Sequence, residues 1–455
     1  MRASEYGGRA GAYVNAQPAA PLRFHSSRGR APALPLSAAL LQGLAPDGGL
    51  YVPSDWPQLV PGDFDGTLEL APVGARLLAP FAAGDALAPQ LGQILSEAFN
   101  FPAPLVPLRA EGRLAVLELF HGPTAAFKDF GARFLAGCFT YLRAGEAREL
   151  TILVATSGDT GGAVAAAFHR RRGVRVVVLY PKGLVSPTQE QQLTCWGDNV
   201  RSLAVRGSFD DCQRLVKEAF LDAPLRAQTQ LSSANSINLG RLLPQSVYYA
   251  AASLAVLRRY GEPASFIIPS GNLGNALACL WARQLGLPIA EVVLAHNANR
   301  SVPDYLAGGE WRPRASIPTL ASAMDVGNPS NMERLLALFP QMHALRAAVS
   351  AFTVSDEQIR ARIRAGFEEF GQIWCPHTAT AAEAWQRLEP QQRDGRRWVL
   401  VATAHPAKFP EIVSPLIGRP VPVPESLAAL FARPRQSVEI DAGLDSLRAV
   451  LQETR

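Results

Sequence analysis

Lys128 is the residue of this chain whose type and setting best suit covalent chemistry. It lies between Phe127 and Phe130 in the segment HGPTAAFKDFG, after the apolar run 114–120. The chain uses lysine at only four positions among its 44 basic residues, so a lysine here departs from the arginine that it uses elsewhere. A lysine amine can form a Schiff base once an apolar environment lowers its pKa, and an arginine cannot. Taken alone, such a lysine is more often an ordinary surface residue whose apolar stem is buried and whose amine reaches solvent.

Two loops of small residues could bind anions. SGDTGG spans 157–162 and SGNLGN spans 270–275, and each follows an apolar run and precedes a helical pattern. In open α/β sheets, ligands bind beyond the carboxyl ends of strands, where the start of a helix presents free backbone N–H groups. Glycine lets the backbone approach a ligand closely. The two loops therefore predict two anionic groups, such as a phosphate and a carboxylate.

Tight strand-to-helix turns without a ligand would leave the same pattern, so that alternative stays open at this stage. Neither loop matches the dinucleotide-binding pattern GxGxxG or the P-loop of nucleotide-binding proteins. The surroundings of Ser157, ATSGD, differ from the GxSxG nucleophile elbow of hydrolases. Functions that depend on NAD, on ATP or on a serine nucleophile are therefore disfavoured.

The segments that must position these residues are predicted to alternate between strands and helices. Apolar runs rich in β-branched residues predict buried strands at 151–155, 174–180, 203–205, 266–268, 292–295 and 398–402. Helices are predicted over 161–169, 209–221, 247–257 and 275–284, with Ser208 as the N-cap of the second. This alternation favours an α/β fold in which parallel sheets are covered on both faces.

Composition and charge narrow the class of protein. The 455 residues are 48% hydrophobic and 18% charged, with a net charge of +5, which is ordinary for a globular protein. No apolar run reaches the roughly 18 residues that a membrane span needs. The excess of arginine is attributed to genome composition and not to a nucleic-acid-binding surface. Five cysteines lie far apart without a CxxC pair, so neither disulfides nor a metal site is predicted, and a cytoplasmic location fits best.

Four segments are predicted along the chain. Residues 1–23 are rich in Gly, Ala and Arg and are expected to form a disordered extension. Residues 24–100 are punctuated by Gly and Pro and are expected to fold as an N-terminal domain. Residues 101–418 contain the alternating strands and helices, and 419–455 are expected to form a C-terminal tail that begins with RPVPVP.

The segment HGPTAAFKDFGARF at 121–134 resembles the lysine segment that binds pyridoxal phosphate (PLP) in the threonine synthases of fungi and many bacteria. The resemblance runs from about residue 24 to 420 and includes further motifs in the same order. These are SSRGRAPALPLSAALLQGLAPDGGLYVP (26–53), ATSGDTGGA (155–163), YPKGLVSPTQEQQL (180–193), SSANSINLGR (232–241), PSGNLGN (269–275), AMDVGNPSN (323–331), CPHTA (375–379) and ATAHPAKFPEIV (402–413). The resemblance implies the PLP-dependent fold-type II architecture, also found in tryptophan synthase β chains. That architecture has two interleaved parallel-sheet lobes, here joined by an N-terminal domain.

The resemblance also implies which residues bind the cofactor. Lys128 would form the Schiff base with PLP, Thr403 would hydrogen-bond the pyridine nitrogen, and Asp159 would lie near the ring. The cofactor phosphate would lie on the loop formed by Ser270, Gly271, Asn272, Leu273, Gly274 and Asn275. The family commonly has leucine at position 125 and phenylalanine at position 273, where this chain has Ala125 and Leu273. Both changes replace one apolar side chain by another.

Substrate contacts follow from the same resemblance. Ser157 and Thr160 would face the substrate carboxylate. The substrate phosphate would be held by Asn235, Ser236 and Arg241, with Lys182 as a further candidate. The guanidinium of Arg241 could grip a phosphate through two hydrogen bonds.

The implied reaction converts O-phospho-L-homoserine and water to L-threonine and phosphate, the last step of threonine biosynthesis. A related phospholyase, which shares these motifs, would instead produce 2-oxobutanoate, ammonia and phosphate. A non-catalytic relative is a third alternative, which the loss of Lys128 or of the second glycine loop would have favoured; both are present. The resemblance implies a monomer or small homo-oligomer that acts on a small molecule.

Overall fold

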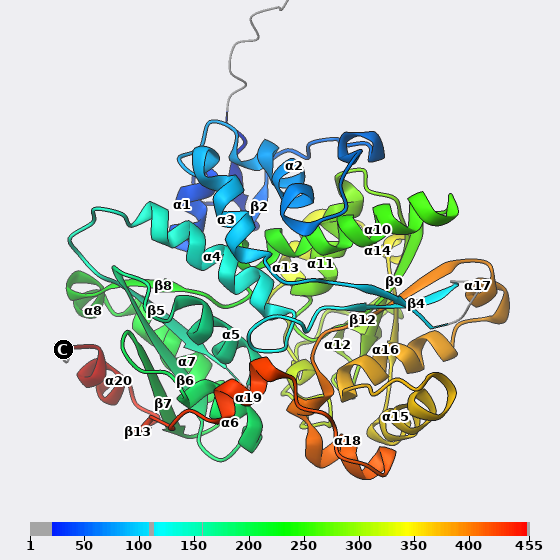
Figure 1. Ribbon diagram of the computed structural model, residues 1–455. Coiled ribbons are helices and arrows are strands. Elements are labelled where there is room, and N and C mark those ends of the chain that lie inside the picture. Colours follow the sequence, from blue (N-terminus) through cyan, green and yellow to red (C-terminus); the bar gives the residue numbers. More distant parts are fainter. Residues whose placement is uncertain (1–20, 109–112, 157, 453–455) are drawn as a thin grey trace, which may run out of the picture.

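The structure, a computed structural model, describes residues 21–108, 113–156 and 158–452 (Figure 1). Most of the extension predicted over 1–23 lies outside these residues, and so does Ser157. The described chain forms two sheets with helices around them, and an N-terminal unit packs against one side. The prediction of two parallel-sheet lobes with an N-terminal domain is confirmed.

The larger sheet has six strands, all parallel except for one edge strand. Their order is β11 (Ser350–Thr353), β10 (Ile289–His296), β9 (Ala264–Pro269), β12 (Arg397–Ala402), β4 (Leu114–Glu118) and β3 (Leu105–Pro107). The antiparallel strand is β3, which pairs with β4. The central strands are buried on both faces, which explains why their sequences are continuously apolar and lack alternation.

The smaller sheet has five parallel strands. Their order is β13 (Val438–Asp441), β7 (Val200–Arg206), β6 (Val174–Pro181), β5 (Leu150–Ala155) and β8 (Gln230–Ser233). Apart from β13, these strands lie in the sequence between β4 and β9 of the larger sheet, so the two lobes are interleaved. The C-terminal segment, expected to be a tail, contributes β13 to this sheet because Ile440 packs with Leu203 and Val205.

Helices cover both faces of each sheet. On the larger sheet, α10 (Ser246–Tyr260) and α11 (Gly274–Gln284) pack on one face and α16 (Pro376–Gln386) packs on the other. On the smaller sheet, α5 (Asp159–Phe168) lies on one face, and α7 (Phe209–Leu221) and α20 (Leu444–Gln452) lie on the other. The faces that carry α5, α10 and α11 share one apolar core, which joins the two lobes.

The remaining helices lie around these layers. They are α6 (Pro187–Thr194), α8 (Ala223–Gln228), α9 (Leu239–Leu242), α12 (Ser301–Leu306), α13 (Met332–Leu338), α14 (Met342–Ala348), α15 (Asp356–Phe370), α17 (Pro390–Asp394), α18 (Pro410–Ile417) and α19 (Glu425–Phe431). Helix α4 (Lys128–Leu142) begins at the predicted functional lysine and lies between the N-terminal unit and α5 (Figure 1).

The N-terminal unit consists of the hairpin β1 (Phe24–Ser26) and β2 (Tyr51–Pro53) with α1 (Leu36–Gln42), α2 (Leu70–Ala82) and α3 (Leu91–Ala98). Two glycines allow it to pack closely. A Cβ atom on Gly74 of α2 would lie 3.3 Å from Val247 of α10, and one on Gly137 of α4 would lie 3.0 Å from Ile94 of α3. The unit therefore shares the apolar core of the two lobes.

The elements predicted from the sequence are confirmed. Each of the six predicted strands lies within an observed one, and the four predicted helices correspond to α5, α7, α10 and α11. Ser208 caps α7 as predicted: its hydroxyl accepts the backbone N–H of Asp211, and the Asp211 carboxylate accepts the N–H of Ser208. Such a capping box stabilises a helix start by about 1 kcal/mol.

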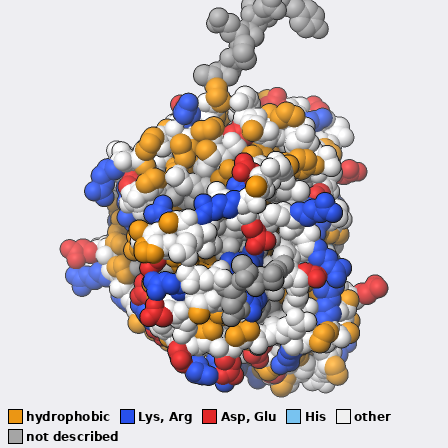
Figure 2. Space-filling model, turned by 90° about the vertical axis from the view of Figure 1, so that its left-hand side faces the viewer, with side chains coloured by type: hydrophobic (Ala, Val, Ile, Leu, Met, Phe, Trp, Pro, Cys, Tyr) orange, Lys and Arg blue, Asp and Glu red, His pale blue; other side chains and the backbone are white. Residues whose placement is uncertain are grey.

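Two further features are the distribution of charged side chains on the surface and the length and apolar character of the helices. On the face shown in Figure 2, basic and acidic side chains are interspersed over the surface. Within residues 21–452, leaving aside the undescribed gaps, no helix has both the length and the apolar character that crossing a membrane requires.

Candidate active site

The carboxyl ends of two adjacent strands bring the second glycine loop and Thr403 together. In the parallel pair β9–β12, Arg397 lies opposite Ala264 and Leu400 lies opposite Ile267. Continuing this register places Thr403 opposite Ser270, at the start of the glycine loop. This edge of the sheet is where open α/β folds bind ligands.

The segment before Lys128 crosses the same edge. The backbone N–H of Phe127 donates to the Thr403 carbonyl at 2.9 Å, and Ala126 forms an antiparallel bridge with Ala404. Because α4 starts at the next residue, the backbone of Lys128 is held beside the end of β12. The structure thus brings Lys128 and Thr403, 275 positions apart in the sequence, to one place.

The second glycine loop contains a hydrogen-bond donor that fits an anion. Leu273, the residue before α11, has a left-handed backbone (φ 62°). The side-chain oxygen of Asn275 accepts the hydroxyls of Tyr248 and Tyr249, at 2.5 and 2.9 Å. Its side-chain nitrogen is buried and finds no hydrogen-bond partner among the described residues. A buried amide N–H without a partner is costly, and a phosphate at the helix start would satisfy it.

The loop that carries AMDVGNPSN forms a wall of this site. A Cβ atom on Gly271 would lie 2.7 Å from the Cα of Met324, so glycine is needed for the two loops to meet. The Asn272 side-chain oxygen accepts the backbone N–H of Ser330 at 2.6 Å, and its nitrogen donates to the hydroxyl of Ser236. From the sequence this stretch had no derivable chemistry and was interpreted as a substrate-facing or lid loop. Its function as a support for residues 271 and 272 depends on a contact between distant segments.

Of the residues predicted at the substrate phosphate, Asn235 lies shortly before α9 and Arg241 lies on it. Arg241 is 2% exposed; its Nη1 donates to the Ala234 carbonyl, while its Nε has no partner in the described part of the chain. Burial lowers the pKa of Arg241 to about 10, so the side chain stays charged at neutral pH. Asn235 donates to the Ala155 carbonyl at the end of β5, at 3.0 Å.

Lys128 is influenced by Arg241 and by the buried ion pair between Asp159 and Lys408. A Cβ atom on Gly131, one turn after Lys128, would lie 2.5 Å from the Arg241 carbonyl oxygen, so this glycine lets α4 approach α9. The side chain of Lys128 is partly buried. Burial lowers its pKa to about 8, and Arg241 and Lys408 act in the same direction, while Asp159 opposes them. About a tenth of the amine would therefore be neutral at pH 7.

Asp159 is held by a lysine that sequence reasoning did not assign to the site. The Lys408 side chain, on the short 3₁₀ helix η5 (Pro406–Lys408), is fully buried; its Nζ lies 2.8 Å from Asp159 Oδ1 and donates to the Thr124 carbonyl at 2.8 Å. Burial alone would raise the pKa of Asp159, but Lys408 and Lys128 outweigh it and hold this pKa well below its usual range. Lys408 could have been noticed because only four lysines occur in the chain.

Lys182 is placed at the surface, away from these contacts. It follows β6 and forms an ion pair with Glu439 of β13, at 2.5 Å, with half of its side chain exposed. Thr160, next to Asp159 on α5, is partly buried. Ser157 lies outside the described residues, so the substrate-carboxylate loop is described only from Gly158 onwards.

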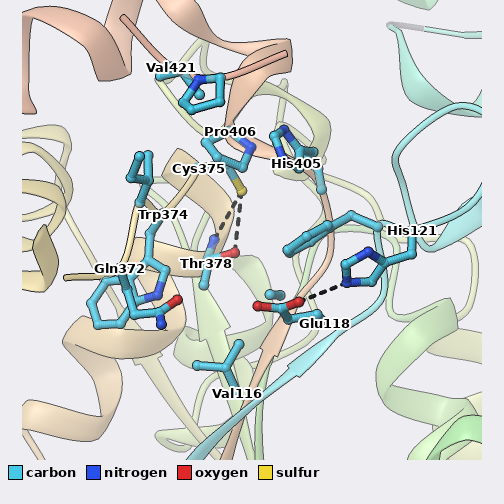
Figure 3. A pocket seen from close by; sticks show the side chains of 15 residues that line it. Val116, Glu118, His121, Gln372, Trp374, Cys375, Thr378, His405, Pro406 and Val421 are labelled. Carbon is cyan, nitrogen blue, oxygen red and sulfur yellow. Dashed lines mark hydrogen bonds and ion pairs between the residues drawn. The ribbon is translucent and has the colours of Figure 1, made fainter. Parts of the chain in front are cut away.

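A cavity of about 300 Å³ lies behind the end of β12 (Figure 3). Its wall includes Ala402 and Ala404 and excludes Thr403 between them, as expected where successive side chains of an extended chain point in opposite directions. Glu118 and His121 form an ion pair of 2.7 Å on one side of it. Because Lys128, Asp159 and the glycine loop do not line this cavity, the residues above define the candidate active site better than cavity size does.

Comparison with known families agrees with this geometry. Residues 97–404 match the family described as pyridoxal-phosphate dependent enzyme. Residues 23–99 match the N terminus of threonine synthase, and residues 378–451 match its C-terminal region.

Individual relatives cover nearly the whole chain. Threonine synthase of Serratia marcescens is 41% identical over 415 residues, which is 91% of this chain and 95% of the relative. The crystal structure of Escherichia coli threonine synthase superposes with a TM-score of 0.87 at 37% identity and covers 94% of this chain and 99% of its own. The PLP-bound threonine synthase of Brucella melitensis superposes with a TM-score of 0.86 at 35% identity, covering 94% and 98%.

Proposed function

The chain belongs to the pyridoxal-phosphate dependent enzymes and, within them, to the threonine synthases, and from this premise we propose that it converts O-phospho-L-homoserine and water to L-threonine and phosphate. The observation that supports it most is the meeting of Lys128, Thr403 and the second glycine loop at the carboxyl edge of β9 and β12. Membership of the family indicates the cofactor and the type of reaction, and the geometry supports the choice of residues.

The residues present fit PLP. Lys128 would hold it covalently, Thr403 would meet its ring nitrogen, and the loop 270–275 would hold its phosphate. The unpartnered side-chain nitrogen of Asn275 supports this assignment because the structure leaves a buried donor where a phosphate would accept it. When bound, PLP withdraws electrons from the substrate carbon next to the amine.

The protein's own groups would bind and orient the substrate. The charged, buried guanidinium of Arg241, with its unpartnered Nε, suits the substrate phosphate, and Asn235 and Ser236 would assist it. Ser157 and Thr160 would receive the carboxylate at the start of α5. The lowered pKa of Lys128 suits it to take a proton from the substrate once its amine is free. Lys182 would have to leave Glu439 to reach the phosphate.

We place the enzyme in the cytoplasm, as a monomer or small homo-oligomer. All five cysteines are buried and free, which suits a reducing compartment. Gel filtration with light scattering would measure the oligomeric state.

Product analysis tests the proposed reaction and separates it from phospholyase activity. PLP-loaded protein incubated with O-phospho-L-homoserine should release L-threonine and phosphate in equal amounts, measured by mass spectrometry. Lys128→Ala should lower the rate by roughly a thousandfold or more because it removes both the covalent link and the proton acceptor. It should also remove the visible absorbance of lysine-bound PLP.

Lys217→Ala is the matched control, because Lys217 is exposed on α7 and belongs to none of these motifs, and it should behave as wild type. Release of 2-oxobutanoate and ammonia in place of threonine would favour the phospholyase alternative. Absence of any turnover by the PLP-loaded wild type would contradict the proposal.

A further inference from the structure

Two lysines interact with the same carboxylate, that of Asp159, in the core of the candidate site. Lys408 contacts Asp159 directly at 2.8 Å, and Asp159 also interacts electrostatically with Lys128. The side chains of Lys408 and Asp159 are 0% and 4% exposed, so water does not screen the pair. Removing one partner of such a buried ion pair strongly destabilises a protein, because the other charge stays buried without a partner.

The pair connects the two lobes at a point close to Lys128. Asp159 begins α5 of the smaller lobe, and Lys408 follows β12 of the larger lobe. The second contact of Lys408 is the carbonyl of Thr124, four residues before Lys128. Lys408 therefore holds Asp159 and the segment that carries Lys128 at the same time.

The other charged groups at this place are few. Around the two lysines and Asp159 lie Arg241 from α9, His377 from α16, Asp129 from α4, Cys375 before α16 and His405 before η5. Burial raises the pKa of Cys375 and lowers that of His405 to about 4, so neither adds charge near neutral pH. Burial lowers the pKa of His377 to about 4, so it adds no charge near neutral pH. Asp129 accepts the backbone N–H and hydroxyl of Thr124, at 2.9 and 2.6 Å, and so is engaged elsewhere. Asp159 is thus the anion that Lys128 and Lys408 compete for.

The competition matters because the two lysines have different tasks. A lysine paired with a buried carboxylate of its own is held in the charged form and cannot accept a proton. A second ammonium on that carboxylate weakens its pull on the first lysine and repels the charge there. We propose that Lys408 is a positioning residue that engages Asp159 so that the free amine of Lys128 remains a proton acceptor near neutral pH. The proton-accepting step rests on the proposed function; the effect of Lys408 on the charge of Lys128 does not.

The test compares wild type with Lys408→Met, which keeps the length of the side chain and removes its charge. In the cofactor-free protein with ¹³Cε-labelled lysine, the four lysines give few enough signals to follow Lys128 individually through a pH titration. We expect the pKa of Lys128 to rise by about one unit or more, so that its neutral fraction at pH 7 falls about tenfold or more. In the PLP-loaded enzyme, the acid limb of the kcat profile should move to higher pH by the same amount, with a smaller change in KM.

Lys217→Met is the matched control, because it removes a lysine that is exposed on α7. It should leave the titration of Lys128 and the kcat profile unchanged. Lys408→Arg keeps the charge and should return the pKa of Lys128 towards the wild-type value. An unchanged or lowered pKa of Lys128 in folded Lys408→Met would overturn the proposal.

A second comparison covers the case in which Lys408→Met fails to fold because Asp159 is left buried without its partner. Asp159→Asn removes that charge, and the double variant Asp159→Asn, Lys408→Met then removes the ammonium without leaving a buried anion. The pKa of Lys128 should be higher in the double variant than in Asp159→Asn alone, and equal values would overturn the proposal. Because this titration needs no substrate, a protein that shows the shift yet makes no threonine would disprove the proposed function and leave the effect of Lys408 on Lys128 established.

Discussion

The two glycine loops share a Ser-Gly start and a glycine at their fifth position, and each follows a strand, yet their helices begin differently. SGDTGG follows β5 and opens α5 with Asp159, whose carboxylate lies at the positive end of that helix and pairs with Lys408. SGNLGN follows β9 and opens α11, whose first turn, 274–277, has only uncharged residues. There the buried nitrogen of Asn275 lacks a partner among the residues described. The first loop therefore carries an anion of its own, the carboxylate of Asp159. The second has an unpartnered donor, the side-chain nitrogen of Asn275, that is available to a bound anion.

The difference shows how far a loop pattern predicts chemistry. Both sequences predict a helix start that could bind an anion, and both helix starts are confirmed. The first turn of each helix decides the electrostatics, since α5 begins with Asp159 and so carries a negative charge there, whereas the first turn of α11 carries none. This difference supports the proposal that the second loop holds the cofactor phosphate and that the first faces the substrate.

Placing a negative charge in the second loop, as Asp159 does in the first, is the sharpest test of this comparison and has the largest expected effect. Asn275→Asp retains an oxygen acceptor for Tyr248 and Tyr249 but replaces the unpartnered N–H by a negative charge. We expect the dissociation constant of PLP to rise by roughly a hundredfold or more, because a donor to a phosphate is lost and a repulsive charge is added. Absorbance titration with PLP measures it.

A matched change at the first loop is Thr160→Ala, which should raise the KM for O-phospho-L-homoserine and leave the affinity for PLP close to wild type. Equal loss of PLP affinity in both variants would remove the distinction between the loops. The unfolding temperature of the cofactor-free proteins checks that neither variant is simply unfolded.

The glycines of the two loops should also respond differently, with a smaller effect. A Cβ atom on Gly271 would lie 2.7 Å from the Met324 backbone, whereas one on Gly162 would lie 3.4 Å from the nearest side-chain atom, in Gln192. Gly271→Ala should cost about 1–3 kcal/mol of stability because backbone must move, and it should weaken PLP binding about tenfold. Gly162→Ala lies within α5 and should be neutral or stabilising by about 0.5 kcal/mol. Urea unfolding measures both, and a reversed order would contradict the packing described here.

The smallest expected effect concerns the charge between the loops. Lys128 has a pKa of about 8 in the folded chain and an ordinary value of 10.5, so between these values the unfolded chain binds a proton that the folded chain does not. The unfolding free energy should therefore rise with pH in this window. Below about pH 8 the folded chain bears the full destabilisation that comes from protonating the buried amine of Lys128. From about pH 8 to about pH 9.5, cofactor-free wild type should gain about 1–2 kcal/mol relative to Lys128→Met. Parallel pH dependences of the two proteins in urea unfolding would contradict the lowered pKa.

Local patterns predicted a large part of the fold and site. The strands of both sheets were recognised from continuous apolar runs, and α7 was recognised together with its Ser208 cap. These features depend on residues that are neighbours in the sequence, so the sequence alone is enough to predict them. Lys128 stood out for a similar reason, as a lysine among phenylalanines in a chain that otherwise uses arginine.

Other features could not be found in this way, because they depend on residues far apart. Lys408 and Asp159 are separated by 249 positions and meet only because folding brings the segments that follow β12 and β5 together. Lys182, which the motif pattern placed at the substrate phosphate, instead pairs with Glu439 of β13, a strand that was itself expected to be part of a tail. The wall that residues 323–331 build against Gly271 is a further example.

The sequence alone therefore determined which side chains could perform covalent and anion-binding chemistry, and the family to which their order belongs, because residue type and short-range spacing are properties of the chain itself. The tertiary structure alone decided that the carboxylate at the first helix start pairs with Lys408, and that burial lowers the pKa of Lys128. The reason is physical: the protonation of a buried amine or carboxyl depends on the charges and the loss of water within a few ångströms of it, and those neighbours come from parts of the chain that only folding brings together.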